Sequence, residues 1–138
     1  MIKPNAIAVW EGTGKTGKGK LTTGSKALVD APYTFKTRFG SAPGTNPEEL
    51  IAAAHAGCFT MKLAFNLETA GFIPTKLETS CVITFENGAV TASELNVEGA
   101  IPGISKEKFG DAIADAEKNC PISKLLNTHI TAKGVLKT

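Results

Sequence analysis

Neither acidic nor basic residues form a block along this sequence, and no continuous apolar run reaches the length of a membrane span. Fifteen Lys and Arg against thirteen Asp and Glu leave a formal net charge of +2. A nucleic-acid-binding protein normally carries a clustered basic surface, and a membrane helix needs about 20 apolar residues. We therefore expect neither a nucleic-acid nor a membrane partner. The first twelve residues contain no apolar run of signal-peptide length, which predicts a cytoplasmic protein.

Cysteine is scarce, with only Cys58, Cys81 and Cys120 in 138 residues. Three cysteines cannot all pair within one chain, and disulfide frameworks are rare in a reducing compartment. A structural disulfide scaffold is therefore not expected. Any cysteine with a function should be reactive or metal-binding.

The rest of the composition is that of a globular protein, with 42% hydrophobic residues and no repeat or low-complexity tract. We expect one domain over residues 1–138. Its N-terminal part has three short β-type runs, which predict an antiparallel meander because turns rich in Gly and Pro separate them. The runs are Ala6–Trp10, Lys20–Thr23 and Tyr33–Thr37.

A long helix is predicted from Pro47 to Gly71. Asn46 is a polar cap, Pro47 suits the first helical position, and Gly71 is a left-handed stop. One face holds apolar residues at spacings of three and four, and further apolar residues occupy other faces. The face consists of Leu50, Ala54, Cys58, Met61 and Phe65, and the others are Ile51, Ala53 and Phe59. One small chain can hardly surround such a helix, so we expect a partner subunit to cover part of it.

The C-terminal part predicts a hairpin, two helices and a last strand. Alternating residues from Leu77 to Phe85 lead into Asn87-Gly88, a type I′ turn signal, and a change of parity places a bulge near 92–94. Ser105 can cap a second helix, and Pro121 starts a short third one. The inward face of the second helix is Phe109, Ala112, Ile113 and Ala116, and the last strand is His129–Lys137. Strands on both sides of a central helix predict the α+β class.

The three cysteines differ in their local context. Cys58 in mid-helix looks like a core residue, since free cysteine is among the most buried residue types. Cys81 falls on the apolar side of a strand and is assigned to the core as well. Cys120 precedes Pro121 and so lies near a helix N-terminus, where a thiolate is favoured.

Arg38 lies close in sequence to the start of the long helix, and we expect it to pair with Glu49. A planar guanidinium can hold a carboxylate at two points and still stabilise a thiolate and the oxygen charge that develops during attack on a peroxide. Glu49 and Cys58 are about half a turn out of phase and roughly 13 Å apart along a straight helix. An Arg38–Glu49 pair could therefore act on Cys58 only if Arg38 reached around a bent helix or if a second subunit supplied the pair.

His55 and Cys58 are three residues apart on one helical face, which allows a zinc site with Cys120 and His129 as further ligands. This spacing is weakly specific because a second close-spaced ligand pair is missing. A core or interface role for His55 is the preferred interpretation.

Three separated motifs are similar to those of the OsmC/Ohr family of osmotically or peroxide-induced hydroperoxide reductases, in the order expected for that family. The motifs are GTNPEELIAAAHAGCF at Gly44–Phe59, TRFG at Thr37–Gly40 and NCPIS at Asn119–Ser123. The likeness covers essentially the whole chain. The segments AVWEG, GFIPTKLETS and IPGISKEKF resemble the OsmC branch rather than the Ohr branch.

The resemblance implies roles for four residues. Cys58 matches the peroxidatic cysteine, Cys120 the resolving cysteine, and Arg38 and Glu49 the pair that activates the thiol. Cys81 matches no motif. The implied fold is an intertwined homodimer whose two long helices are enclosed by antiparallel sheets, with the active sites at the subunit interface.

The implied activity is reduction of organic hydroperoxides through a Cys58 sulfenate and a Cys58–Cys120 disulfide. An external dithiol, implied to be a lipoylated protein or dihydrolipoamide, would recycle it, with no metal or organic cofactor. Apolar residues near the site would favour bulky peroxides; the candidates are Phe35, Phe39, Phe59 and Met61. Two alternatives stay open: a non-catalytic dimer that binds apolar ligands, and a zinc-binding protein that uses His55, Cys58 and Cys120.

Overall fold

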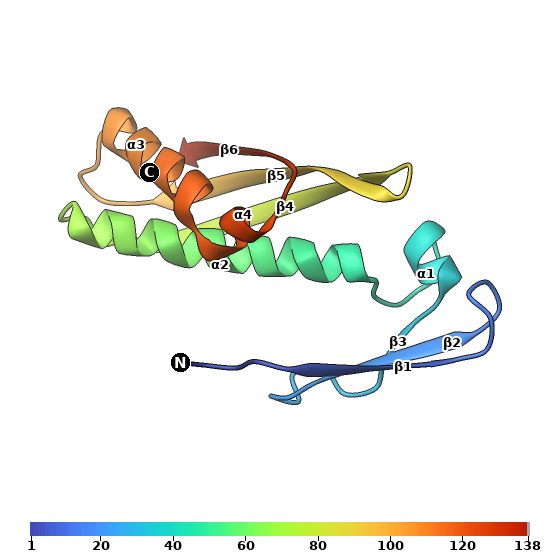
Figure 1. Ribbon diagram of the computed structural model, residues 1–138. Helices are drawn as coiled ribbons and strands as arrows, with labels where there is room; N and C mark the ends of the chain where they lie inside the picture. Colours follow the sequence, from blue (N-terminus) through green and yellow to red (C-terminus); the bar gives the residue numbers. More distant parts are fainter. Residues whose placement is uncertain (138) are drawn as a thin grey trace. The chain divides into compact units, whose positions relative to one another are not determined.

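The computed structural model describes residues 1–137 and divides into two compact units, Met1–Leu50 and the part that starts at Ile51 (Figure 1). The first unit contains β1 (Ala6–Glu11), β2 (Lys18–Thr23) and β3 (Ala31–Tyr33). These strands form one antiparallel sheet in the order β1-β2-β3, which confirms the predicted meander.

The predicted strand Tyr33–Thr37 is wrong beyond its first residue, because α1 (Phe35–Phe39) occupies that position. Thr34 and Thr37 form a reciprocal capping box: Thr37 N–H donates to Thr34 Oγ1 at 3.3 Å, and Thr34 N–H donates to Thr37 Oγ1 at 2.8 Å. These bonds satisfy amides that a short helix leaves without partners. The cap thus outweighs the strand preference of the aromatic residues, and it places Arg38 on a helix.

The long helix α2 (Pro47–Thr69) begins at the predicted residue and ends two residues before the predicted stop at Gly71. Asn46 Oδ1 accepts a hydrogen bond from Glu49 N–H at 2.8 Å, which caps the N-terminus. Gly71 follows the helix with φ of +92°, and Phe72 N–H donates to Leu67 O at 2.9 Å. This is the left-handed termination that glycine permits.

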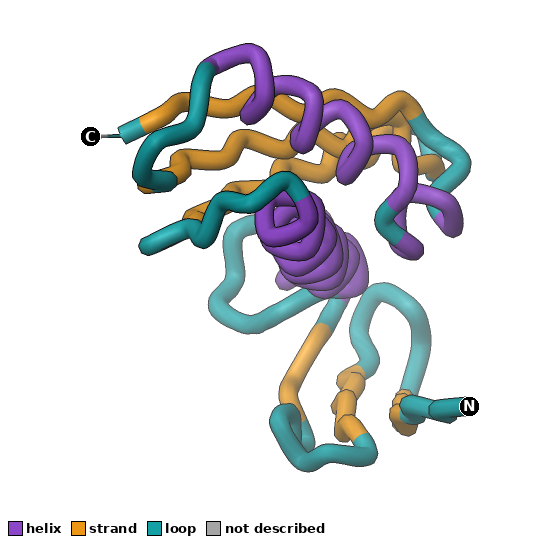
Figure 2. The backbone as a smooth tube through the Cα atoms, turned by 90° about the vertical axis from the view of Figure 1, so that its left-hand side faces the viewer, coloured by secondary structure: helices purple, strands orange, loops and turns teal. Residues whose placement is uncertain are grey.

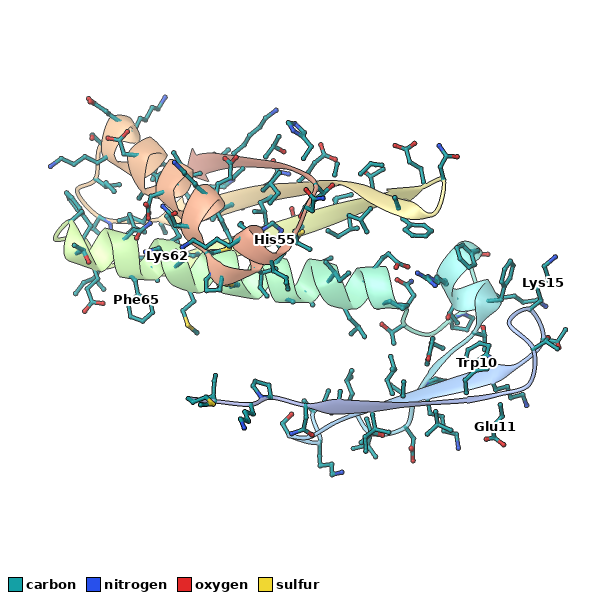
Figure 3. The ribbon with its side chains drawn as sticks, in the orientation of Figure 1. Trp10, Glu11, Lys15, His55, Lys62 and Phe65 are labelled. Atoms are coloured by element: carbon teal, nitrogen blue, oxygen red, sulfur yellow. The ribbon has the colours of Figure 1, made fainter. Side chains whose placement is uncertain are left out.

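The two sides of α2 differ from the predicted pattern. Its fully buried residues repeat every four positions and are His55, Phe59, Leu63 and Leu67. On the predicted apolar face, Met61 is 65% and Phe65 59% exposed. His55 and Phe65 accordingly point to opposite sides of the helix, His55 toward the sheet (Figure 3). Cys58 lies between the two sides and is half-buried.

The second unit contains a sheet in the order β4-β5-β6. Its strands are β4 (Lys76–Glu86), β5 (Ala89–Ala100) and β6 (His129–Leu136). The β4–β5 pair is an antiparallel hairpin, and positive φ at Asn87 and Gly88 confirms the turn. The bulge residue is Thr91, just before the predicted range, since Thr84 pairs with Ala92 while Phe85 pairs with Val90.

Strand β6 corrects the expectation of purely antiparallel sheets, because it runs parallel to β5. A parallel neighbour requires a crossover, and α3 (Lys106–Asn119) and α4 (Pro121–Leu125) supply it. Ser105 caps α3 as predicted, with Lys108 N–H donating to its Oγ at 3.2 Å. The observed class is α+β.

One core cluster joins α2, α3 and the inner face of β5. Figure 2 shows the backbone of these elements, with α2 seen nearly end-on beside the strands of the second sheet. Its members include Phe59, Leu63, Leu67, Leu95, Val97, Phe109, Ile113, Ala116 and Cys120. Gly134 lets β6 approach α3 closely, because a Cβ there would overlap Ile113 Cδ1 and lie 2.9 Å from Phe109 Cε2. The inward face predicted for α3 is confirmed.

By length and composition α2 could cross a membrane, contrary to the expectation that no segment reaches that length. Its buried side belongs to the core of the second unit, and the core helix of a soluble protein meets the same criterion. Length and hydropathy therefore carry no membrane assignment for α2.

Candidate functional site

The structure brings the thiols of Cys58 and Cys120 together. Cys58 lies in the middle of α2, and Cys120 lies at the junction of α3 and α4. The Cys58 thiol interacts with the Cys120 side chain and accepts a hydrogen bond from Ile122 N–H. Two thiols that are 62 positions apart in the sequence are therefore neighbours within the second unit.

Cys120 is fully buried, and its backbone and side chain both take part in the cap of α4. Ser123 N–H donates to Cys120 Sγ at 3.4 Å, and Ser123 Oγ lies 3.1 Å from the same sulfur. Pro121 follows at the first helical position, where its missing N–H removes no helical bond. The predicted helix start at Pro121 is confirmed.

The surroundings of Cys58 do not by themselves activate it. Burial is the largest effect and raises the pKa of the Cys58 thiol above 9.0, and the neighbouring Cys120 raises it further. The hydrogen bond from Ile122 N–H lowers the pKa, because it stabilises the thiolate. None of these effects comes from a positive charge on a described residue, so a reactive thiolate needs a further contribution.

Arg38 pairs with Glu48, and the predicted pair with Glu49 is wrong. Arg38 Nε donates to Glu48 Oε1 at 2.8 Å, and Nη2 donates to Oε2 at 2.9 Å. This two-point contact raises the pKa of Arg38. The guanidinium is therefore held in a defined orientation with its charge intact.

Glu49 is occupied elsewhere: its Oε1 accepts a hydrogen bond from Thr45 Oγ1 at 2.8 Å. Consecutive helical residues point about 100° apart, so only one of two adjacent carboxylates can face Arg38. No local signal in the sequence distinguishes them, and for that reason Glu48 was missed.

An aromatic cavity of about 330 Å³ adjoins Arg38 in the first unit. It is lined by Trp10, Gly14, Tyr33, Thr34, Phe35, Arg38 and Phe39. Two of the four apolar residues named from the sequence, Phe35 and Phe39, thus lie beside Arg38. Phe59 belongs to the core and Met61 is exposed.

His55 is fully buried, and serine hydroxyls hold both ring nitrogens. Nδ1 lies 2.6 Å from Ser93 Oγ, and Nε2 lies 2.7 Å from Ser123 Oγ. A zinc ligand would need one of these nitrogens, and within residues 1–137 no group of three His, Cys, Asp or Glu has metal-binding geometry. This arrangement argues against the zinc alternative.

Cys81 is half-buried on β4, and its Sγ lies 3.3 Å from Ser93 Oγ. Burial raises the pKa of this thiol, while the contact with Ser93 lowers it. Cys81 packs against the core, in line with its assignment from the sequence, but the sequence did not indicate Ser93 as its polar neighbour.

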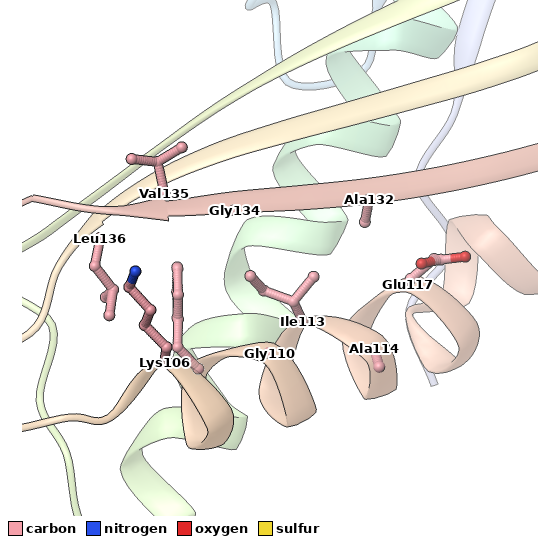
Figure 4. A pocket seen from close by; sticks show the side chains of 10 residues that line it. Lys106, Gly110, Ile113, Ala114, Glu117, Ala132, Gly134, Val135 and Leu136 are labelled. Carbon is pink, nitrogen blue, oxygen red and sulfur yellow. The ribbon is translucent and has the colours of Figure 1, made fainter.

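A larger cavity of about 490 Å³ lies between α3 and β6 (Figure 4). It is lined by Lys106, Phe109, Gly110, Ile113, Ala114, Glu117, Ala132, Gly134, Val135 and Leu136. Neither Cys58 nor Cys120 reaches it. This cavity is therefore separate from the two neighbouring thiols.

Comparison with known proteins agrees with the motifs. The OsmC-like protein family model matches residues 40–133. The chain is 44% identical over 141 aligned positions to Peroxiredoxin OsmC of Escherichia coli (strain K12), covering 99% of each chain.

Solved structures share the fold at lower identity. An OsmC-like protein from Mycoplasma pneumoniae superposes with a TM-score of 0.77 at 14% identity, covering 98% of this chain and 97% of that one. The organic hydroperoxide resistance protein OhrB of Bacillus subtilis gives a TM-score of 0.66 at 23% identity, covering 96% and 98%. With two facing cysteines, a family match over most of the sequence and a full-length relative at 44% identity, this chain belongs to the OsmC family.

Proposed function

We propose that this protein is a thiol-dependent peroxidase that reduces organic hydroperoxides to alcohols. The observation that carries the proposal is the contact between the Cys58 and Cys120 thiols in a chain 44% identical to a protein named Peroxiredoxin OsmC. A peroxidase of this kind needs one sulfur to take up oxygen and a second within reach to form a disulfide.

The reaction uses the two thiols in sequence. The Cys58 thiolate attacks the O–O bond, the alkoxide leaves and is protonated to the alcohol, and Cys58 becomes a sulfenic acid. Cys120 then displaces water to form the Cys58–Cys120 disulfide. An external dithiol reduces this disulfide by exchange, and we propose a lipoylated protein or dihydrolipoamide for that role.

We assign the activation of Cys58 to Arg38, oriented by Glu48. Burial holds the pKa of Cys58 high, so attack at neutral pH requires a nearby cation that stabilises the thiolate. Arg38 is held at two points by Glu48, in the manner that suits a fixed guanidinium. The aromatic cavity beside Arg38 offers an apolar surface for the organic group of the peroxide.

We propose that the protein works as a homodimer in which residues 1–138 form a single domain. The exposed apolar side of α2, with Met61 and Phe65, supports a second copy as the covering partner. The match of one family model to residues 40–133 supports the single domain. Three free cysteines support a reducing compartment, and we assign the protein to the cytoplasm.

The test is peroxide consumption by the purified protein with cumene hydroperoxide and dihydrolipoamide. We expect turnover in the parent, loss of turnover in Cys58→Ser, and retention in Ser80→Ala, an exposed serine on β4 that serves as control. Mass spectrometry after one equivalent of peroxide should identify a Cys58–Cys120 disulfide. A Cys58→Ser protein as active as the parent would end the proposal.

A further inference from the structure

His55 lies at the centre of a continuous line of polar side chains in the second unit. Ser123 Oγ lies 2.7 Å from His55 Nε2 and 3.1 Å from Cys120 Sγ. On the other side, Ser93 Oγ lies 2.6 Å from His55 Nδ1 and 3.3 Å from Cys81 Sγ. The line therefore runs from one thiol through serine, imidazole and serine to another thiol.

This line is buried and complete. His55, Ser93 and Cys120 are at most 1% exposed and Ser123 is 7% exposed. Among the described residues, every buried side-chain nitrogen or oxygen has a hydrogen-bond partner. A fully satisfied buried network holds its side chains in a defined arrangement, and this one includes the Cys120 sulfur of the proposed disulfide.

The available protons allow the hydrogen bonds along this line to point in either of two directions. A neutral imidazole has one N–H, and each serine has one O–H. If His55 Nδ1–H donates to Ser93, then Ser93 donates to Cys81 Sγ, and Nε2 accepts from Ser123. Ser123 Oγ is then the acceptor for the Cys120 S–H.

We propose that Ser123 and His55 form a proton relay that deprotonates Cys120 when it attacks the oxidised Cys58. This inference rests on the proposed peroxidase function. Ser123 touches the reacting sulfur, and His55 is a positioning residue that acts through Ser123. The relay uses the direction in which Nδ1–H donates to Ser93, because that tautomer leaves Nε2 able to accept a proton.

The step balances within the protein. The Cys120 proton passes to Ser123 Oγ while the Ser123 proton passes to His55 Nε2. The Cys120 sulfur forms the S–S bond, and the S–O bond of the Cys58 sulfenic acid breaks with its electron pair on oxygen. The imidazolium returns its proton through Ser123 to the departing hydroxide, which leaves as water.

Burial supports this role because it lowers the pKa of His55 and keeps the resting imidazole neutral. The titratable side chains that face His55 through the two serines are Cys81 on β4 and Cys120 at the start of α4, with Cys58 next to Cys120. A neutral base next to a thiol is the arrangement that transfers a proton only during reaction.

Rapid-quench mass spectrometry separates the two chemical steps. After one equivalent of cumene hydroperoxide, a sulfenic-acid trap counts oxidised Cys58 and the disulfide is counted directly. In Ser123→Ala and His55→Gln we expect sulfenate formation within about twofold of the parent and disulfide formation at least tenfold slower. Ser123→Thr, which retains the hydroxyl, should restore disulfide formation to within about threefold.

The outcomes distinguish the relay from the function on which it rests. If the parent forms no sulfenate, the peroxidase proposal fails and the relay with it. If the parent reacts and Ser123→Ala or His55→Gln forms the disulfide at the parental rate, only the relay is overturned. A Ser123→Thr protein as slow as Ser123→Ala would also overturn it.

The parent protein allows a second test that needs no substitution. Nitrogen NMR of the ¹⁵N-histidine-labelled reduced protein reports which ring nitrogen of His55 carries the proton, and exposed His129 provides the reference signal. We expect protonated Nδ1 and unprotonated Nε2. The opposite tautomer would make His55 a donor to Ser123 and overturn the proposal.

Discussion

The Arg38 guanidinium donates two hydrogen bonds to the Glu48 carboxylate, with N···O distances of 2.8 and 2.9 Å. The adjacent Glu49 instead accepts a hydrogen bond from Thr45. Because both glutamates open the same helix, they form a matched pair for testing which one supports Arg38. They differ in their partners and scarcely in their position along the chain.

Glu48→Gln should lower kcat/KM for cumene hydroperoxide by about 10- to 100-fold, because hydrogen bonds to charged groups contribute roughly 1.5–3 kcal/mol. Glu49→Gln should stay within about threefold of the parent. Steady-state assays with saturating dithiol check both. Equal losses in the two variants would remove Glu48 from its assigned role.

Arg38→Met should shift the reactivity of Cys58 to higher pH. Burial already raises the pKa of this thiol, so without the Arg38 charge the thiolate fraction at neutral pH falls about tenfold for each pKa unit. Peptide-resolved alkylation rates from pH 6 to 10 provide the measurement. Lys36→Met, a change of another basic residue on α1, should leave the profile in place.

The stability of the folded protein should decrease as the pH falls from 7 to 5. Burial lowers the pKa of folded His55 below the ordinary 6.5, so in this window the unfolded chain binds the proton more readily. Above pH 6.5 both states hold a neutral imidazole, and the full stability is present.

Urea unfolding at several pH values measures this effect, whose slope for one proton is at most about 1.4 kcal/mol per pH unit. His55→Gln should flatten the dependence, and His129→Gln should retain it. The same slope in parent and His55→Gln proteins would assign the titration to another group.

Gly134→Val should destabilise the protein by about 1–3 kcal/mol, because the new side chain overlaps Ile113 and Phe109 on α3. Gly110→Ala is the control on the facing helix. A Cβ at Gly110 meets no atom within 4 Å, and alanine in a helix should add about 0.5–1 kcal/mol. Thermal and urea unfolding should show a lower free energy of unfolding for Gly134→Val and a higher one for Gly110→Ala.

Charge on the exposed side of α2 should abolish the proposed dimer. The double variant Met61→Glu, Phe65→Glu replaces two apolar side chains with carboxylates. Met61 is 65% and Phe65 is 59% exposed in the single chain. Light scattering after size exclusion should show half the parental mass. Val82→Glu, on an exposed apolar residue of β4, should leave the mass unchanged. A monomeric parent would refute the dimer.

Elements with strong local signals were predicted with nearly correct limits. Asn46 and Gly71 define the ends of α2 through bonds to their own neighbours, and Asn87-Gly88 closes its hairpin for the same reason. The segment after Tyr33 was predicted wrongly, because aromatic residues favour a strand while the Thr34–Thr37 cap stabilises a helix. Propensity alone does not rank these two contributions.

The sequence by itself determined the helix ends, the hairpin turn and, through its motifs, the two cysteines of the family. Only the tertiary structure decided that Glu48 meets Arg38, that β6 runs parallel to β5, and that His55 joins Ser93 to Ser123. The physical reason is the separation along the sequence of the residues that interact. Caps and turns depend on residues a few positions apart, whereas a contact such as His55–Ser123 spans 68 positions and exists only after the sheet and helices pack.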